Sequence, residues 1–253
     1  MAIYKHPIPI LEHDDDPTAL IMNNRHNILL PRRAVLAFLG DTIDDYAQRT
    51  GAEIIEIFHT ITRDTPIYRI NYKGEALCLC RAPLGGSAAV QLMDFLIGHG
   101  VKSIISAGSC GALAPLPENA FLVPNLALRD EGASYHYLAP SRFVETSAEV
   151  RKVIEKVLAA RELKYTECTT WTTDGFYRET REMVAYRRSE GCLTVEMECA
   201  SLAACAQFRG VQFGQLLYTA DSLADARNYE ERGWGGDSLE PALQLCLEIA
   251  ANL

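Results

Sequence analysis

The sequence of 253 residues lacks several patterns that would assign a function directly. Its eight cysteines form no Cys-x-x-Cys pair, and its six histidines show neither His-Glu-x-x-His nor His-x-x-Glu-His spacing, so we expect no metal site. No Gly-x-Gly-x-x-Gly follows an expected strand, which argues against a dinucleotide-binding protein and leaves no cofactor to expect. We interpret the cysteines as reduced, small core residues.

Long apolar runs and net positive charge are also missing. No run approaches the roughly 18–20 residues that a transmembrane helix needs. The start of the chain acquires Asp14, Asp15 and Asp16 without an apolar region, unlike a signal peptide. With 33 acidic and 24 basic residues, the net charge of −9 argues against a nucleic-acid or anionic-membrane surface. We therefore expect a cytoplasmic protein that binds neither nucleic acid nor membranes.

The residues that are present have the composition of a globular protein, with 48% hydrophobic residues. Strand-like runs alternate with helical ones, and this alternation predicts a largely parallel sheet covered on both faces. We expect an α/β fold, a single-domain three-layer α/β/α sandwich with a mixed, largely parallel central sheet over residues 34–253, after a lead segment of residues 1–33. The expected strands are 34–39, 53–58, 67–80 with a turn at 72–74, 103–107, 121–128, 165–173, 193–196 and 211–220, and the expected helices are 42–48, 88–99, 145–163, 178–190, 198–208 and 239–252.

The stretch from Ser103 to Leu116, SIISAGSCGALAPL, begins apolar and then breaks into small residues that include Gly108 and Gly111. This pattern indicates a buried strand that runs into a turn whose backbone N–H groups could meet a ligand. Phosphate is the usual ligand of such a turn, yet the stretch contains no Lys or Arg. Since ligands bind beyond the carboxyl ends of parallel strands, the ends at 107–111, 195–198 and 220–221 are the places to search for a site.

Two carboxylates flank a methionine at the second of these strand ends. In an alternating strand Glu196 and Glu198 share a face, with Met197 on the other. A carboxylate accepts two hydrogen bonds from vicinal hydroxyls, and a thioether offers an apolar surface to a sugar. An ordinary helix start, where acidic residues favour the helix dipole, explains the pattern about as well.

Asp221 closes the last apolar strand. Partial burial there would raise its pKa and suit it to act as a general acid. A helix N-cap is the simpler alternative, because aspartate is favoured at that position.

Together these segments resemble the nucleoside phosphorylase family, which groups purine nucleoside and uridine phosphorylases with methylthioadenosine/adenosylhomocysteine nucleosidases. The resemblance covers residues 34–253, and its motifs keep the family's order. The motifs are Gly108-Ser-Cys-Gly-Ala112, Asp130-Glu-Gly-Ala-Ser-Tyr-His136, Thr173-Asp-Gly-Phe-Tyr177, Val195-Glu-Met-Glu198 and Asp221.

The resemblance implies an enzyme that cleaves the C1′–N glycosidic bond of a nucleoside in a fold of this class. It implies that Glu198, with Glu196 beside it, holds the ribose hydroxyls, and that Met197 packs against the sugar. Phe176 would stack on the base, and Asp221 would protonate the leaving base.

The phosphate-binding arginines of the phosphorylase branch are largely replaced. Where the family has an arginine after the first strand, beyond Gly40, this chain has Asp44, and a second arginine position is Ser106. A third, which the family takes from a neighbouring subunit, corresponds to Arg63. The resemblance thus assigns a phosphate or water site to Gly40, Ser106, Ser109 and Arg63. A replacement charge could come from Arg81, for which a solvated surface arginine is the favoured interpretation.

The identity of the base also remains open. Uridine phosphorylases read uracil with a Gln-x-Arg after the Phe-Tyr pair, but here Thr180 stands at the glutamine position with Arg181 beside it. These two residues are assigned to base binding, and the missing uracil readers favour a purine. The resemblance also implies a homo-oligomer with shared active sites, to which His6, His13 or His26 could contribute.

We therefore expect a nucleoside phosphorylase-like enzyme acting on a small-molecule, purine-type nucleoside, with inorganic phosphate as the nominal co-substrate. A nucleosidase that uses water is the first alternative, because Asp44 and Ser106 replace two phosphate-binding arginines. A nucleoside-binding protein without activity is the second.

Overall fold

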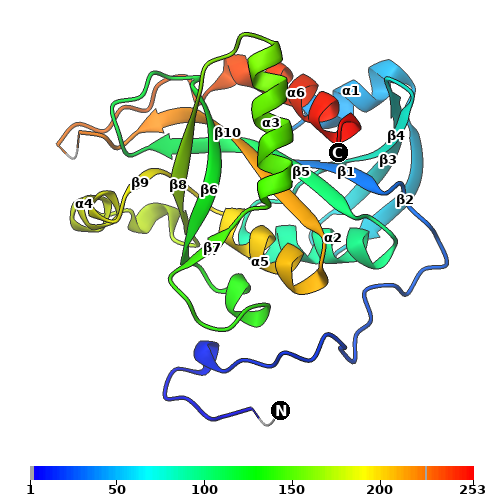
Figure 1. Ribbon diagram of the computed structural model, residues 1–253, viewed down its shortest axis with the longest axis horizontal. Coiled ribbons are helices and arrows are strands. Elements are labelled where there is room, and N and C mark those ends of the chain that lie inside the picture. The colour runs from blue at the N-terminus through cyan, green and yellow to red at the C-terminus, as the bar shows by residue number, and fades with distance from the viewer. Residues whose placement is uncertain (1–2, 226) are drawn as a thin grey trace.

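The computed structural model describes residues 3–225 and 227–253 and shows helices on both sides of a central sheet (Figure 1). Its strands are β1 (Arg33–Ala37), β2 (Glu53–His59), β3 (Asp64–Tyr72), β4 (Glu75–Arg81), β5 (Ser103–Ala112), β6 (Phe121–Asp130), β7 (Phe143–Glu145), β8 (Tyr165–Thr173), β9 (Cys192–Glu196) and β10 (Gln212–Ser222). Its α-helices are α1 (Thr42–Thr50), α2 (Gly86–Gly98), α3 (Ala148–Ala160), α4 (Arg181–Ser189), α5 (Cys199–Arg209) and α6 (Leu239–Ala251), and its short 3₁₀ helices are η1 (Pro9–Leu11), η2 (Ala133–His136), η3 (Phe176–Arg178) and η4 (Gly236–Ser238).

The strands of the described residues form one ten-stranded mixed sheet in the order β10-β6-β8-β9-β5-β1-β4-β3-β2, with β7 paired to β6. Parallel pairs join β4, β1, β5 and β10 at its centre, and an antiparallel hairpin ladder of β2, β3 and β4 forms one edge. Strand β10 pairs with both β5 and β6, so β5, β10, β6, β8 and β9 close into a ring. The predicted fold class is confirmed. The pattern of apolar runs in the sequence does not predict the ring of strands.

Two apolar cores lie on opposite faces of the sheet. Alternate residues of β1 divide between them, with Ala34 and Leu36 in one and Val35 and Ala37 in the other, as the two-residue repeat of a strand requires. Helices α2 and α5 cover the first face, and α1, α3 and α6 cover the second (Figure 1). Both faces of the central strands are therefore buried.

The glycine-rich stretch after residue 107 is a strand and not the expected turn. Strand β5 continues to Ala112, pairing in parallel with β10 to Cys110 and, after a register shift, at Ala112, while Gly111 and Ala112 pair in antiparallel with β9. A Cβ built on Gly111 would lie 2.9 Å from side-chain atoms of both Leu223 and Val195. Glycine is needed here because three strands approach too closely for a side chain.

Two predicted helix starts are also corrected. The expected helix 145–163 begins at Ala148, because residues 143–145 pair with β6 as the short strand β7, and Ser147 caps the helix by accepting from Val150 N. The helix expected from 88 begins at Gly86 with Gly85 at its N-cap, so Ser87 lies inside the first turn. A Cβ on Gly86 would lie 2.3 Å from Ser201 Oγ, which shows how closely α2 approaches α5.

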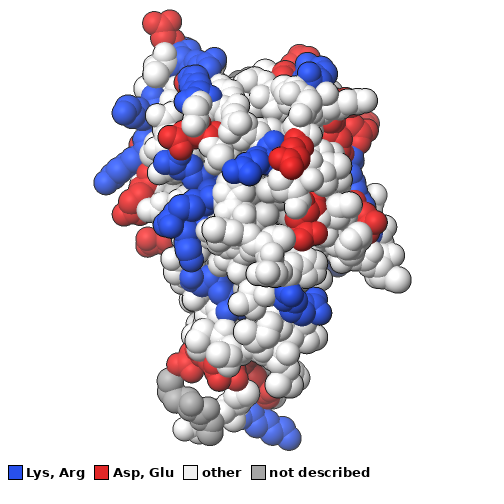
Figure 2. All heavy atoms as spheres, turned by 90° about the vertical axis from the view of Figure 1, so that its right-hand side faces the viewer, with Lys and Arg blue, Asp and Glu red and all other residues white. Residues whose placement is uncertain are grey.

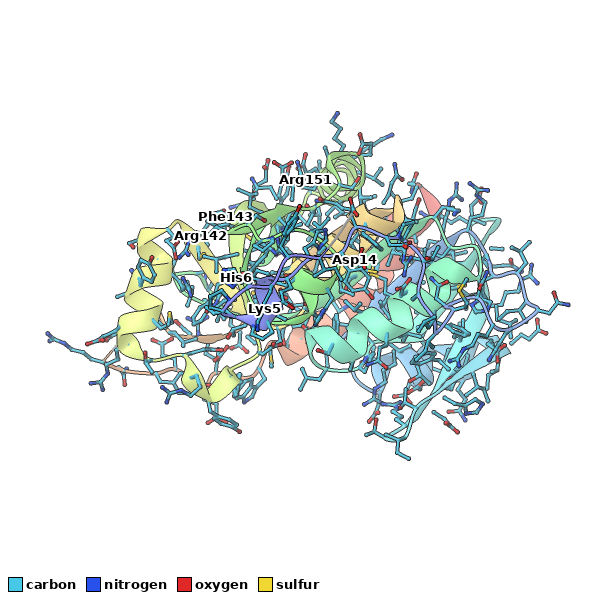
Figure 3. The ribbon with its side chains drawn as sticks, turned by 90° about the horizontal axis from the view of Figure 1, so that it is seen from below. Lys5, His6, Asp14, Arg142, Phe143 and Arg151 are labelled. Carbon is cyan, nitrogen blue, oxygen red and sulfur yellow. The ribbon has the colours of Figure 1, made fainter. Side chains whose placement is uncertain are left out.

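The lead segment lies on the face covered by α2 and α5. Seen from below, the stretch that carries Lys5, His6 and Asp14 crosses this face (Figure 3). It is attached by Asn23, which donates to Asp94 of α2, and by Arg209 of α5, which donates to the Pro17 carbonyl. The boundary at residues 33 and 34 remains a prediction, although β1 begins at Arg33.

The end of the molecule formed by β2–β4 carries interspersed positive and negative residues around an uncharged centre (Figure 2). This end includes exposed apolar side chains, of which Ile61 at the β2–β3 turn is fully exposed. In the described residues, none of the helices has the length and apolarity needed to cross a membrane.

We expect Gly111→Ala to lower the free energy of unfolding by about 1–3 kcal/mol, because the added methyl overpacks the contact between β5, β9 and β10. Urea denaturation measures this loss. Gly236→Ala is the matched control, since a Cβ there meets no heavy atom within 4 Å. An equally stable Gly111→Ala protein would contradict the close packing described here.

Candidate active site

A cavity of about 470 Å³ opens where β5, β9 and β10 end and η3 passes over them. A second cavity, of about 650 Å³, adjoins it and shares several wall residues with it. The shared residues are Phe176, Tyr177, Glu179, Asp221 and Trp234. We call the first the inner cavity and the second the outer cavity.

The structure brings most of the expected sugar and base residues together. Glu198 and Asp221 both line the inner cavity, as the strand-end argument predicts. The other expected residues in its wall are Ser109, Phe176, Glu196 and Met197. Arg181 lines the outer cavity only. The described walls of the two cavities do not include Gly40, Arg63, Ser106 or Thr180.

Glu196 is the last residue of β9 and is tied to the chain that follows it. Its Oε2 accepts from the backbone N–H groups of Glu198 (2.8 Å) and Cys199 (2.7 Å), and its Oε1 accepts from Thr172 Oγ1 (2.6 Å). The strand ends here, so the alternation that would place Glu196 and Glu198 on one strand face does not extend to Glu198. Both oxygens of Glu196 have partners inside the protein, whereas a sugar ligand needs a free acceptor.

Glu198 occupies the N-cap position of α5 and is buried. The backbone N–H of Gly85 donates to its Oε1 at 2.6 Å, which fixes the carboxyl against the loop before α2. Burial, and next the charge of Glu196, raise the pKa of Glu198. Because Glu196 accepts hydrogen bonds that favour its anion, we assign the shared negative charge to Glu196 and the proton to Glu198 when the cavity is empty.

Asp221 lies in β10, which runs on to Ser222, and the next helix of the described chain begins only at Gly236. The N-cap alternative for Asp221 is therefore wrong. Burial raises the pKa of Asp221, while Tyr229 and Arg232 oppose that shift by favouring the ionised form. The net upward shift of its pKa makes the Asp221 carboxyl a better proton donor at a given pH than an exposed aspartate.

Glu179 is a residue that the sequence argument missed. It follows η3 and lines both cavities with Asp221. Burial raises the pKa of Glu179 to about 7, and the charge of Asp221 adds to the effect. Its position just after the Phe176-Tyr177 pair is the one signal that could have found it.

The other residues expected to bind the base divide between two roles. Phe176 is 42% exposed and presents its ring to both cavities. Thr180 instead caps α4, with its hydroxyl accepting from Met183 N at 3.3 Å.

The expected phosphate-site arginine is paired within the chain. Arg63 donates to Asp44 Oδ2 at 3.4 Å, and Arg81 pairs with both Asp41 and Asp44. Tyr68 donates to the other Asp44 oxygen at 3.0 Å. Arg81 is thus an ion-paired residue rather than the solvated one expected. Asp44 occupies both guanidinium groups in place of an external anion.

Two other expected members of that site stand apart from the cavities. Gly40 adopts a left-handed conformation (φ 56°) between β1 and α1. Ser106 is fully buried in β5, and within the described residues its Oγ has no hydrogen-bond partner. In the part of the chain that the structure describes, no group of three or more His, Cys, Asp or Glu side chains is arranged to hold a metal ion.

The comparisons with known proteins agree with this architecture. The family model described as "Phosphorylase superfamily" matches residues 32–251. The chain belongs to the phosphorylase superfamily. Among curated relatives, a guanosine phosphorylase of Halorubrum lacusprofundi is 28% identical over 181 residues, covering 70% of this chain and 71% of that one. A DeoD-type purine nucleoside phosphorylase of Caldanaerobacter subterraneus is 26% identical over 191 residues, covering 71% and 78%.

Solved structures share the fold. Uridine phosphorylase of Vibrio fischeri superimposes with a TM-score of 0.75 at 21% identity and covers 92% of this chain and 95% of its own. The 5′-methylthioadenosine/S-adenosyl homocysteine nucleosidase of Campylobacter jejuni gives 0.73 at 18% identity, with 88% and 100% covered. The superfamily member described here is an enzyme of the nucleoside phosphorylase and nucleosidase group, as the motifs predict.

We expect Glu196→Gln to lower the free energy of unfolding by about 1–3 kcal/mol, because an amide cannot accept all the hydrogen bonds that the carboxylate accepts. Chemical denaturation at neutral pH measures the loss. Glu198→Gln is the matched control: Glu198 is assigned the proton, so a neutral amide preserves its charge state and can still accept from the Gly85 N–H, and stability should stay about equal. Equal destabilisation by both substitutions would contradict the roles assigned to the two carboxyls.

Proposed function

We propose that this protein cleaves the N-glycosidic bond of a purine nucleoside and that water is the acceptor. The observation that carries the proposal is the wall of the inner cavity: Glu198 and Asp221 face one space, and the described residues that line it include no Lys or Arg. The carboxyls supply sugar recognition and acid catalysis, and the missing cations favour a neutral acceptor.

Glu198 is the proposed ligand of the ribose 2′- and 3′-hydroxyls. A carboxylate accepts from two vicinal hydroxyls, and the Gly85 N–H holds its other face. Met197, in the same wall, offers the sugar an apolar surface. As C1′ gains positive charge in the transition state, the anionic carboxyls near it stabilise that charge without reorganising.

Asp221 is the proposed general acid, and Phe176 stacks on the base. The electron pair of the C1′–N9 bond moves to the purine as the bond breaks, and N7 takes the proton from Asp221. The water oxygen bonds to C1′ and releases one proton to solvent, and Asp221 takes up a proton before the next turnover. The products are free ribose and the neutral base.

Charge decides the acceptor. A phosphate in the inner cavity would share it with Glu196, the carboxyl to which we assign the negative charge, and the described residues of the wall include no Lys or Arg to balance it. Like charges at short range in a partly dehydrated site cost several kcal/mol by order of magnitude unless a cation is paired with them. Arg63 and Arg81 could serve as such cations, but both are engaged by Asp44.

Phosphorolysis is the second candidate, and the curated relatives favour it, because those named above are phosphorylases. It requires a cation from outside the cavity, for which Arg63 of a neighbouring copy is the proposed source. A homo-oligomer would also cover the apolar mouth of the site, where Leu84 and Tyr177 are 76% and 93% exposed.

We expect base release from inosine and adenosine to proceed at the same rate in phosphate-free buffer and in saturating phosphate, with free ribose as the sugar product. Coupled absorbance assays for the base, and chromatography of the sugar, measure both. A strict need for phosphate with formation of ribose 1-phosphate would overturn the water proposal and support phosphorolysis. If neither nucleoside is cleaved under any condition, the activity itself is contradicted.

We expect Asp221→Asn to reduce kcat by a factor of about 10²–10⁴, the usual contribution of a general acid. Glu198→Gln should instead raise KM more than it lowers kcat. In the wild type, kcat/KM should fall as pH rises through the raised pKa of Asp221, since the acid is active only when protonated. An Asn variant that retains full kcat on a purine nucleoside would show that the acid is assigned wrongly.

A further inference from the structure

Glu179 stands beside the proposed acid in a position that the proposed chemistry does not use. It enters the walls of both cavities together with Asp221 and Phe176, so it faces the end of the site where the base would lie. Among the described residues, no hydrogen bond or ion pair involves its carboxyl, although Arg181 lies two residues away in the sequence and lines the outer cavity with it. It is therefore a half-buried carboxyl with its hydrogen-bonding capacity free.

The purine edge that meets Asp221 carries a second polar group next to N7. In a 6-aminopurine this neighbour is the N6 amino group, a donor, and in a 6-oxopurine it is O6, an acceptor. A carboxyl placed beside the acid can meet either group. Its ionised form accepts from an amino group, and its protonated form donates to a carbonyl oxygen.

Resting on the proposed function, we propose that Glu179 is a specificity residue that reads the C6 substituent of the purine. Ionised, it accepts from the N6 amino group of a 6-aminopurine nucleoside. Protonated, it donates to O6 of a 6-oxopurine nucleoside. Asp221 serves N7 in both cases, so one site takes both substrate classes and the protonation of Glu179 sets the preference between them.

The pKa of Glu179 places this exchange near neutrality, because burial raises it to about 7. The charge of Asp221, on β10, is the second contribution to this shift. The remaining charged and titratable groups in the walls that Glu179 shares are Cys110, Tyr177, Arg181, Glu196, Glu198, Asp225, Arg227, Tyr229 and Glu231. Titration of Asp221 changes kcat/KM for both substrates through the same N7 contact. Its effect therefore cancels in the ratio of the two kcat/KM values.

The test is the ratio of kcat/KM for adenosine to kcat/KM for inosine between pH 6 and pH 8. The ionised-to-protonated ratio of one carboxyl changes about tenfold per pH unit, which is the upper limit for the selectivity change. We expect the ratio to rise at least about tenfold over this range in the wild type. In Glu179→Gln, whose amide does not titrate, the ratio should stay within about twofold.

Glu182→Gln is the matched control, because Glu182 is an exposed glutamate of α4 outside both cavity walls, and it should keep the wild-type pH response. A circular dichroism spectrum and urea midpoint show whether each variant is folded. A wild-type ratio that does not change with pH, or a Gln variant that keeps the wild-type response, would overturn the role of Glu179. Cleavage of neither nucleoside contradicts the proposed function instead, so the two failures are distinguishable.

Discussion

The hydrogen bonds that Glu196 accepts are the constraint on which the site depends. They join the end of β9 to the first amide groups of α5, so the chain bends where Met197 and Glu198 enter the cavity. A buried anion at the start of a helix is stabilised by the free N–H groups of the first turn, which here replace the water that burial removed. Because Glu196 makes these structural hydrogen bonds, the neighbouring carboxyl of Glu198 does not have to make them. It remains available for hydrogen bonds with a ligand.

Burial also determines the properties of the other carboxyls in the cavity. Burial raises the pKa of Glu198, Asp221 and Glu179, so protons are taken up there more readily than at an exposed carboxyl. Arg63 and Arg81 are paired with Asp44 outside the inner cavity. The described residues in the wall of the inner cavity include carboxyls and apolar groups but no Lys or Arg, whereas Arg181 and Arg227 line the outer cavity.

Much of this could be predicted from the sequence because apolar periodicity and strand ends are local signals. The buried runs that end at Glu196 and Asp221 placed both residues on one edge of the sheet, and the structure confirms a common cavity. The glycine stretch failed as a turn because glycine serves both turns and close packing, and only the ring of strands shows that Gly111 serves packing. Glu179 was missed because its burial depends on segments distant in sequence, among them the loop after β10 that lines the outer cavity with it.

The division of the site between strands and loops has a physical logic. Glu196, Met197 and Glu198 lie at the junction of a buried strand and a buried helix, whose position is fixed by the core on both sides of the sheet. Phe176 and Glu179 lie on the connection from β8 to α4, which contributes little to either core. A sugar is common to all nucleosides and is best held by fixed groups, whereas bases differ and are best read by a connection that can vary without disturbing the core. Under the proposed function, the base-reading carboxyl of Glu179 thus lies on a connection that can vary, while the proposed sugar-holding carboxyl of Glu198 is fixed by the core.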